Sequence, residues 1–340
     1  MGSVRDIAKR AGVSITTVSR VLNNHPRVSD EAREKVLSAA NASRYVAHVG
    51  RRSTSNIAFL YTGESSLGSP FDAALLQGMS EGMEEYGYDL MVLSARRAKH
   101  PHETYTQMFM RKGVRCVVIR TTHQTRHVCE AIAEEGFPSI VVADHFDHPK
   151  VNFIHADSRQ TSREVVEHLI GLGHTRIACS INVIDDSDHM DRLAGYCDAL
   201  EQHGLPFDER LVMRIPAYRD GGVQLIKRLI TMAHRPTAVF ITDPMVAVAA
   251  MNQARQMGLR IPEDLSVVGF DDAELRYGMT PGMTAVCQDA VAMGREAFAA
   301  LQEILKTRGD EVRIRKSLPT WVEIHESTGP APQITDFSPS

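Results

Sequence analysis

The chain of 340 residues lacks any run of about 18 consecutive apolar residues, the length that a membrane-spanning helix needs. The sequence therefore predicts no transmembrane segment. The N-terminus carries a charged, helix-like segment where a secretory signal would need an apolar stretch. We expect a protein of the cytoplasm.

Cysteine is scarce and scattered, which argues against a disulfide framework. The five cysteines are odd in number, and no two form a CxxC pair: Cys116, Cys129, Cys179, Cys197 and Cys287. We expect reduced, buried thiols.

Sequence motifs of catalysis are also missing. The chain has no GxGxxG after a strand, no GxxxxGK[ST] loop, no HExxH and no GxSxG. Cys287 has no adjacent base that would activate it as a nucleophile. Asp185, Asp186, Asp188 and His189 could suggest a metal site, but without a convincing ligand spacing they favour a solvated loop. We expect no enzyme activity, no cofactor and no metal.

Charge is distributed unevenly along the chain, whose net charge is -4. Residues 1–52 hold ten Lys/Arg and four Asp/Glu, about +6, whereas the remainder carries about -10. Only the N-terminal region therefore attracts phosphate. The length, with 43% hydrophobic residues, predicts two or three domains.

Two short helical patterns joined by a glycine turn occupy residues 4–23, and they are typical of a helix-turn-helix. Gly12 can end the first helix in a left-handed conformation, and Ser14 is placed to cap the second. Ser29 can cap a third helix, which would complete a three-helix headpiece. In the second helix Val18, Val21 and Leu22 face inward, while an outward face remains for a major groove: Ile15, Thr16, Ser19 and Arg20. A small surface helical hairpin is the alternative.

The stretch DIAKRAGVSITTVSRVLN, followed by RVSDEAREKV, resembles the headpiece of the lactose/galactose-repressor (LacI/GalR) family of bacterial regulators as far as Tyr45. The resemblance implies that Ile15, Thr16 and Arg20 read bases. It also implies backbone-phosphate contacts or helix-packing roles for Ser14, Thr17, Ser19 and Asn23, and we include Arg27 among the DNA contacts. Arg20 can donate two hydrogen bonds to guanine.

The linker departs from the family pattern. Ala47 replaces a proline, His48 an asparagine and Thr54 the leucine that enters the minor groove in the family. Arg51 and Arg52 are candidate phosphate or minor-groove contacts, and a solvated linker explains the segment equally well.

Beyond the linker, short β-rich runs alternate with amphipathic segments, which is typical of an open parallel α/β sheet. Seven runs show this pattern: 57–61, 90–93, 116–119, 139–142, 176–181, 238–242 and 265–270. The segments RPTAVFITDPMVAVAAM, GLRIPEDLSVVGFDD and TPGMTAV resemble the periplasmic-binding-protein-like core of the same family. The resemblance implies a two-lobed core of parallel, doubly wound sheets.

The predicted domains follow from these patterns. We expect an all-α headpiece at 1–46, a shortened linker at 47–56 and an effector-binding and dimerisation core at 57–328. The core divides into an N-lobe and a C-lobe, at 57–156 with 286–318, and at 157–285 with 319–328. The tail at 329–340, rich in Pro, Ser and Thr and without a leucine heptad, predicts disorder and no tetramerising coiled coil. We expect a homodimer, which suits a pseudo-palindromic operator.

Doubly wound lobes bind small molecules beyond the carboxyl ends of their strands. The residues that follow the predicted strands are unusually polar, and the effector-binding candidates are Phe71, Asp72, Arg120, Thr121, Asp144, His145, Arg192, Thr242, Asp271 and Gln288. The resemblance implies effector contacts for Arg192, Asp144, Asp271 and Phe71. Thr242 replaces an asparagine that is common in sugar-responsive members. Alternatively, Asp271 and Asp272 cap the next helix, Arg192 forms a surface ion pair and Phe71 belongs to the core.

We therefore expect a sequence-specific transcriptional regulator, acting as a repressor, that is controlled by a sugar or sugar derivative bound between the lobes. A small-molecule binding protein without a DNA role is the alternative. Arg120, directly after a buried strand, would be costly to bury without an anion, so an acidic sugar is a further hypothesis.

Overall fold

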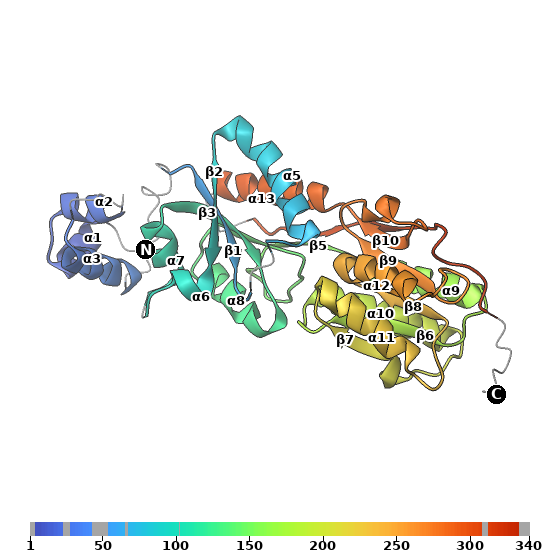
Figure 1. Ribbon diagram of the computed structural model, residues 1–340. Coiled ribbons are helices and arrows are strands. Elements are labelled where there is room, and N and C mark those ends of the chain that lie inside the picture. The colour runs from blue at the N-terminus through green and yellow to red at the C-terminus, as the bar shows by residue number, and fades with distance from the viewer. Residues whose placement is uncertain are drawn as a thin grey trace. The chain divides into compact units, whose positions relative to one another are not determined.

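The structure is a computed structural model that describes residues 4–22, 28–42, 54–64, 67–101, 103–307 and 312–332. Its N-terminal part consists of three helices, α1 (Val4–Ala11), α2 (Ile15–Leu22) and α3 (Asp30–Ala42) (Figure 1). Gly12, with φ +65°, ends α1 in the left-handed conformation that glycine adopts without a steric penalty. Ile7, Val18 and Val36, one from each helix, are fully buried together. The predicted three-helix headpiece is confirmed.

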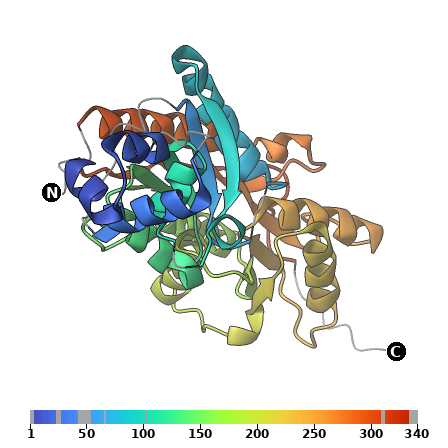
Figure 2. The same ribbon diagram turned by 90° about the vertical axis from the view of Figure 1, so that its left-hand side faces the viewer.

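The first α/β sheet has the strand order β11-β5-β4-β3-β1-β2. Its strands are β1 (Asn56–Tyr61), β2 (Asp89–Ser94), β3 (Val114–Arg120), β4 (Ser139–Val142), β5 (Phe153–Ala156) and β11 (Arg315–Leu318). Neighbours from β5 to β2 pair in parallel, with β1 between β2 and β3. Connecting helices are α5 (Pro70–Tyr86), α6 (Ala95–Ala98), α7 (Tyr105–Arg111), α8 (Arg126–Glu134) and α13 (Ala290–Lys306). Figures 1 and 2 show α5 and α13 side by side.

The second sheet has the order β12-β10-β9-β8-β6-β7, and only β12 runs antiparallel to its neighbour. Its strands are β6 (Ile177–Asn182), β7 (Val212–Ile215), β8 (Ala238–Ile241), β9 (Ser266–Asp271), β10 (Thr284–Gln288) and β12 (Thr320–Glu323). Its helices are α9 (Arg159–Gly171), α10 (Ser187–Gln202), α11 (Arg219–Ile230) and α12 (Pro244–Gln256).

Both faces of the second sheet are covered, as a doubly wound fold requires. Alternate residues of β8 enter different cores: Phe240 joins Tyr196 of α10 on one face, and Val239 joins Leu225 of α11 on the other. The predicted doubly wound architecture is confirmed. Among the described residues, no helix has both the length and the apolar character to cross a membrane.

Two predicted boundaries need correction. Residues 286–288 belong to β10, which pairs with β9 and β12 of the second sheet, so the second N-lobe segment begins after Gln288. The predicted disordered tail begins too early. Gly329 is buried, its N–H donates to Ser266 Oγ at 3.1 Å and its oxygen lies 3.0 Å from His174 Nε2, while Ala331 N–H donates to the Leu172 carbonyl. These bonds hold residues 329–331 on the second sheet.

Candidate functional site

The N-cap and the buried residues of α2 determine which of its side chains are exposed. Ser14 Oγ accepts a hydrogen bond from Thr17 N at 3.0 Å, so Ser14 is the predicted N-cap. Because Val18 and Val21 are buried, Ile15, Thr16 and Arg20 fall on the exposed side of the helix. Ile15 keeps half of its surface accessible, so its side chain is available to a partner on this side of the helix.

The other predicted DNA contacts divide into two groups. Ser14 and Thr17 bond to each other through their hydroxyl oxygens, 2.9 Å apart, and Ser19 is half-buried. Ser14 and Thr17 lie at the N-terminal end of α2, where Ile15 also lies, and Ser19 is one helical turn after Ile15. The remaining predicted contacts lie outside the described residues: Asn23, Arg27, Arg51 and Arg52.

In the first sheet, a buried hydroxyl cluster follows β1 and β3. Thr62 Oγ1 donates to Thr121 Oγ1 at 2.9 Å, and it lies 2.7 Å from Thr125 Oγ1. Thr121 was a predicted effector contact, and its hydroxyl takes part in this internal network. Arg120, at the end of β3, directs Nη1 toward the Val142 carbonyl oxygen at 3.4 Å.

Asp144 forms the main ion pair at this edge of the first sheet. Its Oδ1 accepts from Arg126 Nη1 at 2.7 Å and from the backbone N–H of His145 at 2.8 Å. Arg126 Nη2 also donates to the His145 carbonyl at 2.6 Å, and its guanidinium lies 4.0 Å from the Phe146 ring centre. Asp144 is fully buried, so the pair fixes a carboxylate at the predicted position.

The sequence interpretation missed Arg126, which lies six residues beyond β3 and begins α8. Extending the search from strand ends to the first turn of the next helix would have found it. The predicted candidates Phe71 and Asp72 lie in the first turn of α5, and both are buried.

Arg192 of α10 is a buried cation beside the second sheet, held by contacts on several sides. Its Nη1 donates to the Thr242 carbonyl oxygen at 2.7 Å, Cζ lies 3.4 Å from the Phe270 ring centre, and Asp188 Oδ2 is 3.9 Å from Nη2. The side chain is buried, yet Nε has no hydrogen-bond partner. Thr242 is buried too, and its hydroxyl donates to the Ser180 carbonyl at 3.0 Å. Arg192 and Asp188 are both buried, so the alternative of an ion pair on the surface is wrong.

Asp272 and Gln288 form a second buried polar pair, in which Gln288 Nε2 donates to Asp272 Oδ1. Burial raises the pKa of Asp272 to about 6, while the nearby Arg192 charge and the Gln288 bond oppose that rise. Gln288 Oε1 is buried without a hydrogen-bond partner. Gln288 was predicted from the sequence, whereas Asp272 was considered only as a helix cap. Arg192, Asp272 and Gln288 are called the Arg192 cluster below.

Asp271 has a structural environment that differs from its predicted role. Oδ1 accepts from the backbone N–H groups of Ala273 and Leu275, and Oδ2 accepts from Arg276 N and from Arg276 Nη1 at 2.8 Å. Arg276 also forms two bonds to Glu323, at 2.8 and 2.9 Å. The carboxylate thus caps the turn after β9, which is the alternative reading of this residue, and its acceptor positions are occupied.

No group of acidic, histidine or cysteine side chains among the described residues is arranged to hold a metal. Asp186, proposed for a solvated loop, instead caps α10 by accepting from His189 N at 2.8 Å. All five cysteines are free thiols, and burial raises the pKa of Cys129 and of Cys287 to about 12. Such thiols are poor nucleophiles at neutral pH.

Comparison with known proteins identifies this arrangement of headpiece and core. The model of bacterial regulatory proteins of the lacI family matches residues 3–47, and that of a periplasmic binding protein-like domain matches residues 166–328. The HTH-type transcriptional regulator DegA of Bacillus subtilis is 30% identical over 338 residues, covering 96% of this chain and 98% of DegA. The chain belongs to the lacI family of bacterial regulatory proteins.

This lacI-family regulator is also 29% identical to the HTH-type transcriptional repressor PurR of Vibrio atlanticus, over 95% of this chain and 98% of PurR. The solved complex of the transcriptional regulator CelR with cellobiose has a TM-score of 0.70 and 28% identity, covering 96% of this chain and 100% of CelR. A regulator from Enterococcus faecium with bound ribose, at 22% identity and a TM-score of 0.71 over 81% of this chain and 99% of that one, shares the fold. The protein is thus a DNA-binding transcriptional regulator with a ligand-binding domain, and its relatives are regulators rather than enzymes.

Proposed function

We propose that this regulator represses transcription as a homodimer on a pseudo-palindromic operator, and that a sugar or sugar derivative controls its operator affinity. The observation that carries the effector proposal is the pair of unsatisfied buried atoms in the Arg192 cluster, Arg192 Nε and Gln288 Oε1. Buried polar atoms normally have hydrogen-bond partners. A sugar hydroxyl both donates and accepts, so neighbouring hydroxyls can satisfy the amide oxygen and the guanidinium N–H together.

The relatives agree with a carbohydrate ligand, since CelR is solved as a complex with cellobiose. A buried arginine stacked on an aromatic ring also provides a flat, preorganised donor for a polar ligand. In the first sheet, the Asp144–Arg126 pair offers a second fixed carboxylate for the same ligand class. Arg120 Nη1 is directed at a backbone oxygen, a contact that neither supports nor contradicts an acidic ligand. The acidic-sugar hypothesis for Arg120 therefore stays a prediction.

The DNA-binding proposal rests on the exposed side of α2. Ile15 and Thr16 offer methyl groups for thymine, and Arg20 offers the guanidinium fork that matches guanine. Binding through this face would place the protein in the cytoplasm, on the nucleoid when it occupies an operator.

The homodimer proposal is supported by the free edge of the first sheet. β2 ends the strand order, and its Leu90 and Val92 are 37% and 42% exposed. Exposed apolar side chains on an edge strand favour contact with a second chain. Replacing Val92 with Lys should shift the mass in sedimentation velocity from dimer toward monomer, whereas Lys227→Ala on α11 should not.

The central experiment is a fluorescence-anisotropy titration on an operator selected from random duplexes, with and without cellobiose, glucose or gluconate. We expect salt-sensitive operator binding that one of these carbohydrates changes at least fivefold, together with a rise in melting temperature. A carbohydrate-dependent melting shift with no DNA binding under any condition would instead identify a small-molecule binding protein.

A further inference from the structure

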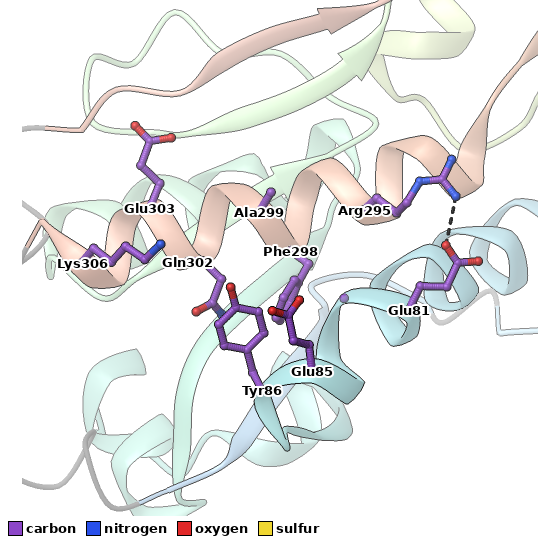
Figure 3. Close-up of a pocket in the computed structure, with 10 residues that line it drawn as sticks. Glu81, Glu85, Tyr86, Arg295, Phe298, Ala299, Gln302, Glu303 and Lys306 are labelled. Carbon is purple, nitrogen blue, oxygen red and sulfur yellow. Dashed lines mark hydrogen bonds and ion pairs between the residues drawn. The ribbon is translucent and has the colours of Figure 1, made fainter.

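A groove of about 580 Å³ lies between the C-terminal half of α5 and α13, two of the helices that connect strands of the first sheet (Figure 3). Every lining residue comes from these two helices. It shares no residue with the Arg192 cluster or with the headpiece, so it belongs to neither of the proposed binding sites.

Two aromatic rings that line the groove, Tyr86 and Phe298, give it an apolar wall, and the ring of Tyr88 packs against both of them. Phe298 lies 5.6 Å from the Tyr86 ring centre and 6.1 Å from that of Tyr88, and the two tyrosines stack 6.1 Å apart. Phe298 fits closely because of Gly82 on the facing helix, where a Cβ atom would come within 2.4 Å of the Phe298 ring. Phe298 is buried, whereas Tyr86 keeps 47% of its surface exposed. The wall is therefore formed in advance, with one ring available to a ligand.

One polar side chain in the groove lacks a hydrogen-bond partner. Gln302 of α13 is only 9% exposed, and its Nε2 is buried with no acceptor in reach. In Figure 3 the Gln302 side chain extends from α13 toward Tyr86. A buried amide N–H without an acceptor is unfavourable, so a ligand that brings an acceptor would form a stabilising hydrogen bond here.

The charges around the groove disfavour an anion. Arg295 is paired with Glu81 at 3.0 Å and closes one end. The other charged lining residues are the carboxylates of Glu85 and Glu303 and the ammonium of Lys306, and Glu303 points away from Tyr86 in Figure 3. A bound carboxylate or phosphate would therefore meet more negative than positive charge.

We propose that this groove is a second small-molecule site, which binds a neutral aromatic or heteroaromatic molecule that carries a hydrogen-bond acceptor. The ring packs against Tyr86 and Phe298, where aromatic pairs contribute beyond the area they bury. The acceptor, such as a carboxamide oxygen, accepts a hydrogen bond from Gln302 Nε2. Ligand binding here is independent of the effector proposed for the Arg192 cluster.

The test uses benzamide as the probe on the full-length protein, followed by saturation-transfer difference NMR. Two analogues change one property each: cyclohexanecarboxamide lacks the aromatic ring, and benzoate carries a charge. Wild-type protein should bind benzamide at least threefold more tightly than either analogue. Gln302→Met, which keeps the length and removes the donor, should weaken benzamide binding by roughly threefold to tenfold.

Ala299 provides a blocking variant, since it is exposed and lines the groove without a hydrogen-bonding side chain. Ala299→Trp should abolish the benzamide signal while the melting temperature and the mass in solution stay unchanged, and Lys227→Ala serves as the matched surface control. Failure of wild-type protein to bind benzamide, or equal binding by Ala299→Trp, would overturn the proposal. Loss of the dimer in Ala299→Trp would also overturn it, because the groove would then be covered by a second copy of the chain.

Discussion

The guanidinium carbon of Arg192 lies 3.4 Å from the centre of the Phe270 ring, and the same side chain donates to the carbonyl oxygen of Thr242. The ring and the carbonyl hold the guanidinium plane in one orientation. Only Nε of this buried group remains without a partner, so the protein has already paid the entropy of ordering the donor before a ligand arrives.

Replacing Arg192 with Lys should therefore remove the effector response. Lysine keeps the charge but cannot stack its head on Phe270 while it presents a fixed second donor. We expect carbohydrate affinity to fall about tenfold or more, as for loss of a charge-assisted hydrogen bond. Operator affinity without effector should be unchanged in anisotropy titrations. A variant that still responds to the carbohydrate with wild-type sensitivity would exclude Arg192 from the site.

Arg20→Ala should weaken binding to the selected operator by about 1–3 kcal/mol and binding to random duplex much less. The reason is that a base contact carries sequence information, whereas a phosphate contact does not. Lys35→Ala is the matched control, because it also removes one exposed positive charge, from α3. Equal losses on operator and random DNA for Arg20→Ala would assign this residue to the phosphates.

The pKa of Asp272 predicts a pH dependence of stability. Its folded pKa of about 6 lies above the ordinary value of 3.8, so the folded protein binds the proton more tightly than the unfolded chain. Stability from this group is therefore gained as the pH falls through 6 toward 4. Between pH 7.5 and pH 5, urea unfolding of the wild type should gain about 1 kcal/mol relative to Asp272→Asn. Parallel pH profiles for the two proteins would contradict the burial-induced shift.

Asp271→Asn should destabilise the fold without affecting the effector in the protein that remains folded. The change weakens a capping carboxylate and leaves Glu323 as the one carboxylate that pairs with the buried Arg276 among the described contacts. We expect a loss of about 3 kcal/mol in urea unfolding at pH 7.5, as when one partner of a buried ion pair is removed. Asp272→Asn at the same pH should not show this loss. An Asp271→Asn protein with normal stability and no carbohydrate binding would restore the effector role predicted from the sequence.

The two neighbouring aspartates, Asp271 and Asp272, show which contacts the sequence could not predict. Residues 271 and 272 are both polar and both follow a buried strand, and successive side chains at a strand end point in opposite directions. Only the backbone path after β9 determines that Asp271 turns toward the N–H groups and that Asp272 lies beside Gln288. The sequence predicts polar residues directly after this strand, but it does not show which groups their carboxylates contact.

The headpiece was easier to predict, because each of its signals is local. Gly12, Ser14 and Ser29 end or begin helices through contacts within four residues, and the structure shows all three. The seven apolar strand runs correspond to β1, β2, β3, β4, β6, β8 and β9. The missed strands are short or partly polar, such as β5, whose pairing with β4 depends on residues far from it in sequence. Gln302 was missed for a related reason, since one glutamine in an amphipathic helix has no local pattern.

The bond between Arg192 and Thr242 also bears on how effector preference could diverge within the family. Every amino acid supplies the same carbonyl oxygen, so an exchange at position 242 keeps the acceptor for Arg192 while it changes the side chain at the proposed effector site. A single substitution at position 242 can therefore change the side chain while Arg192 keeps its hydrogen bond to the backbone. Ligand preference could then change without loss of the arginine's position.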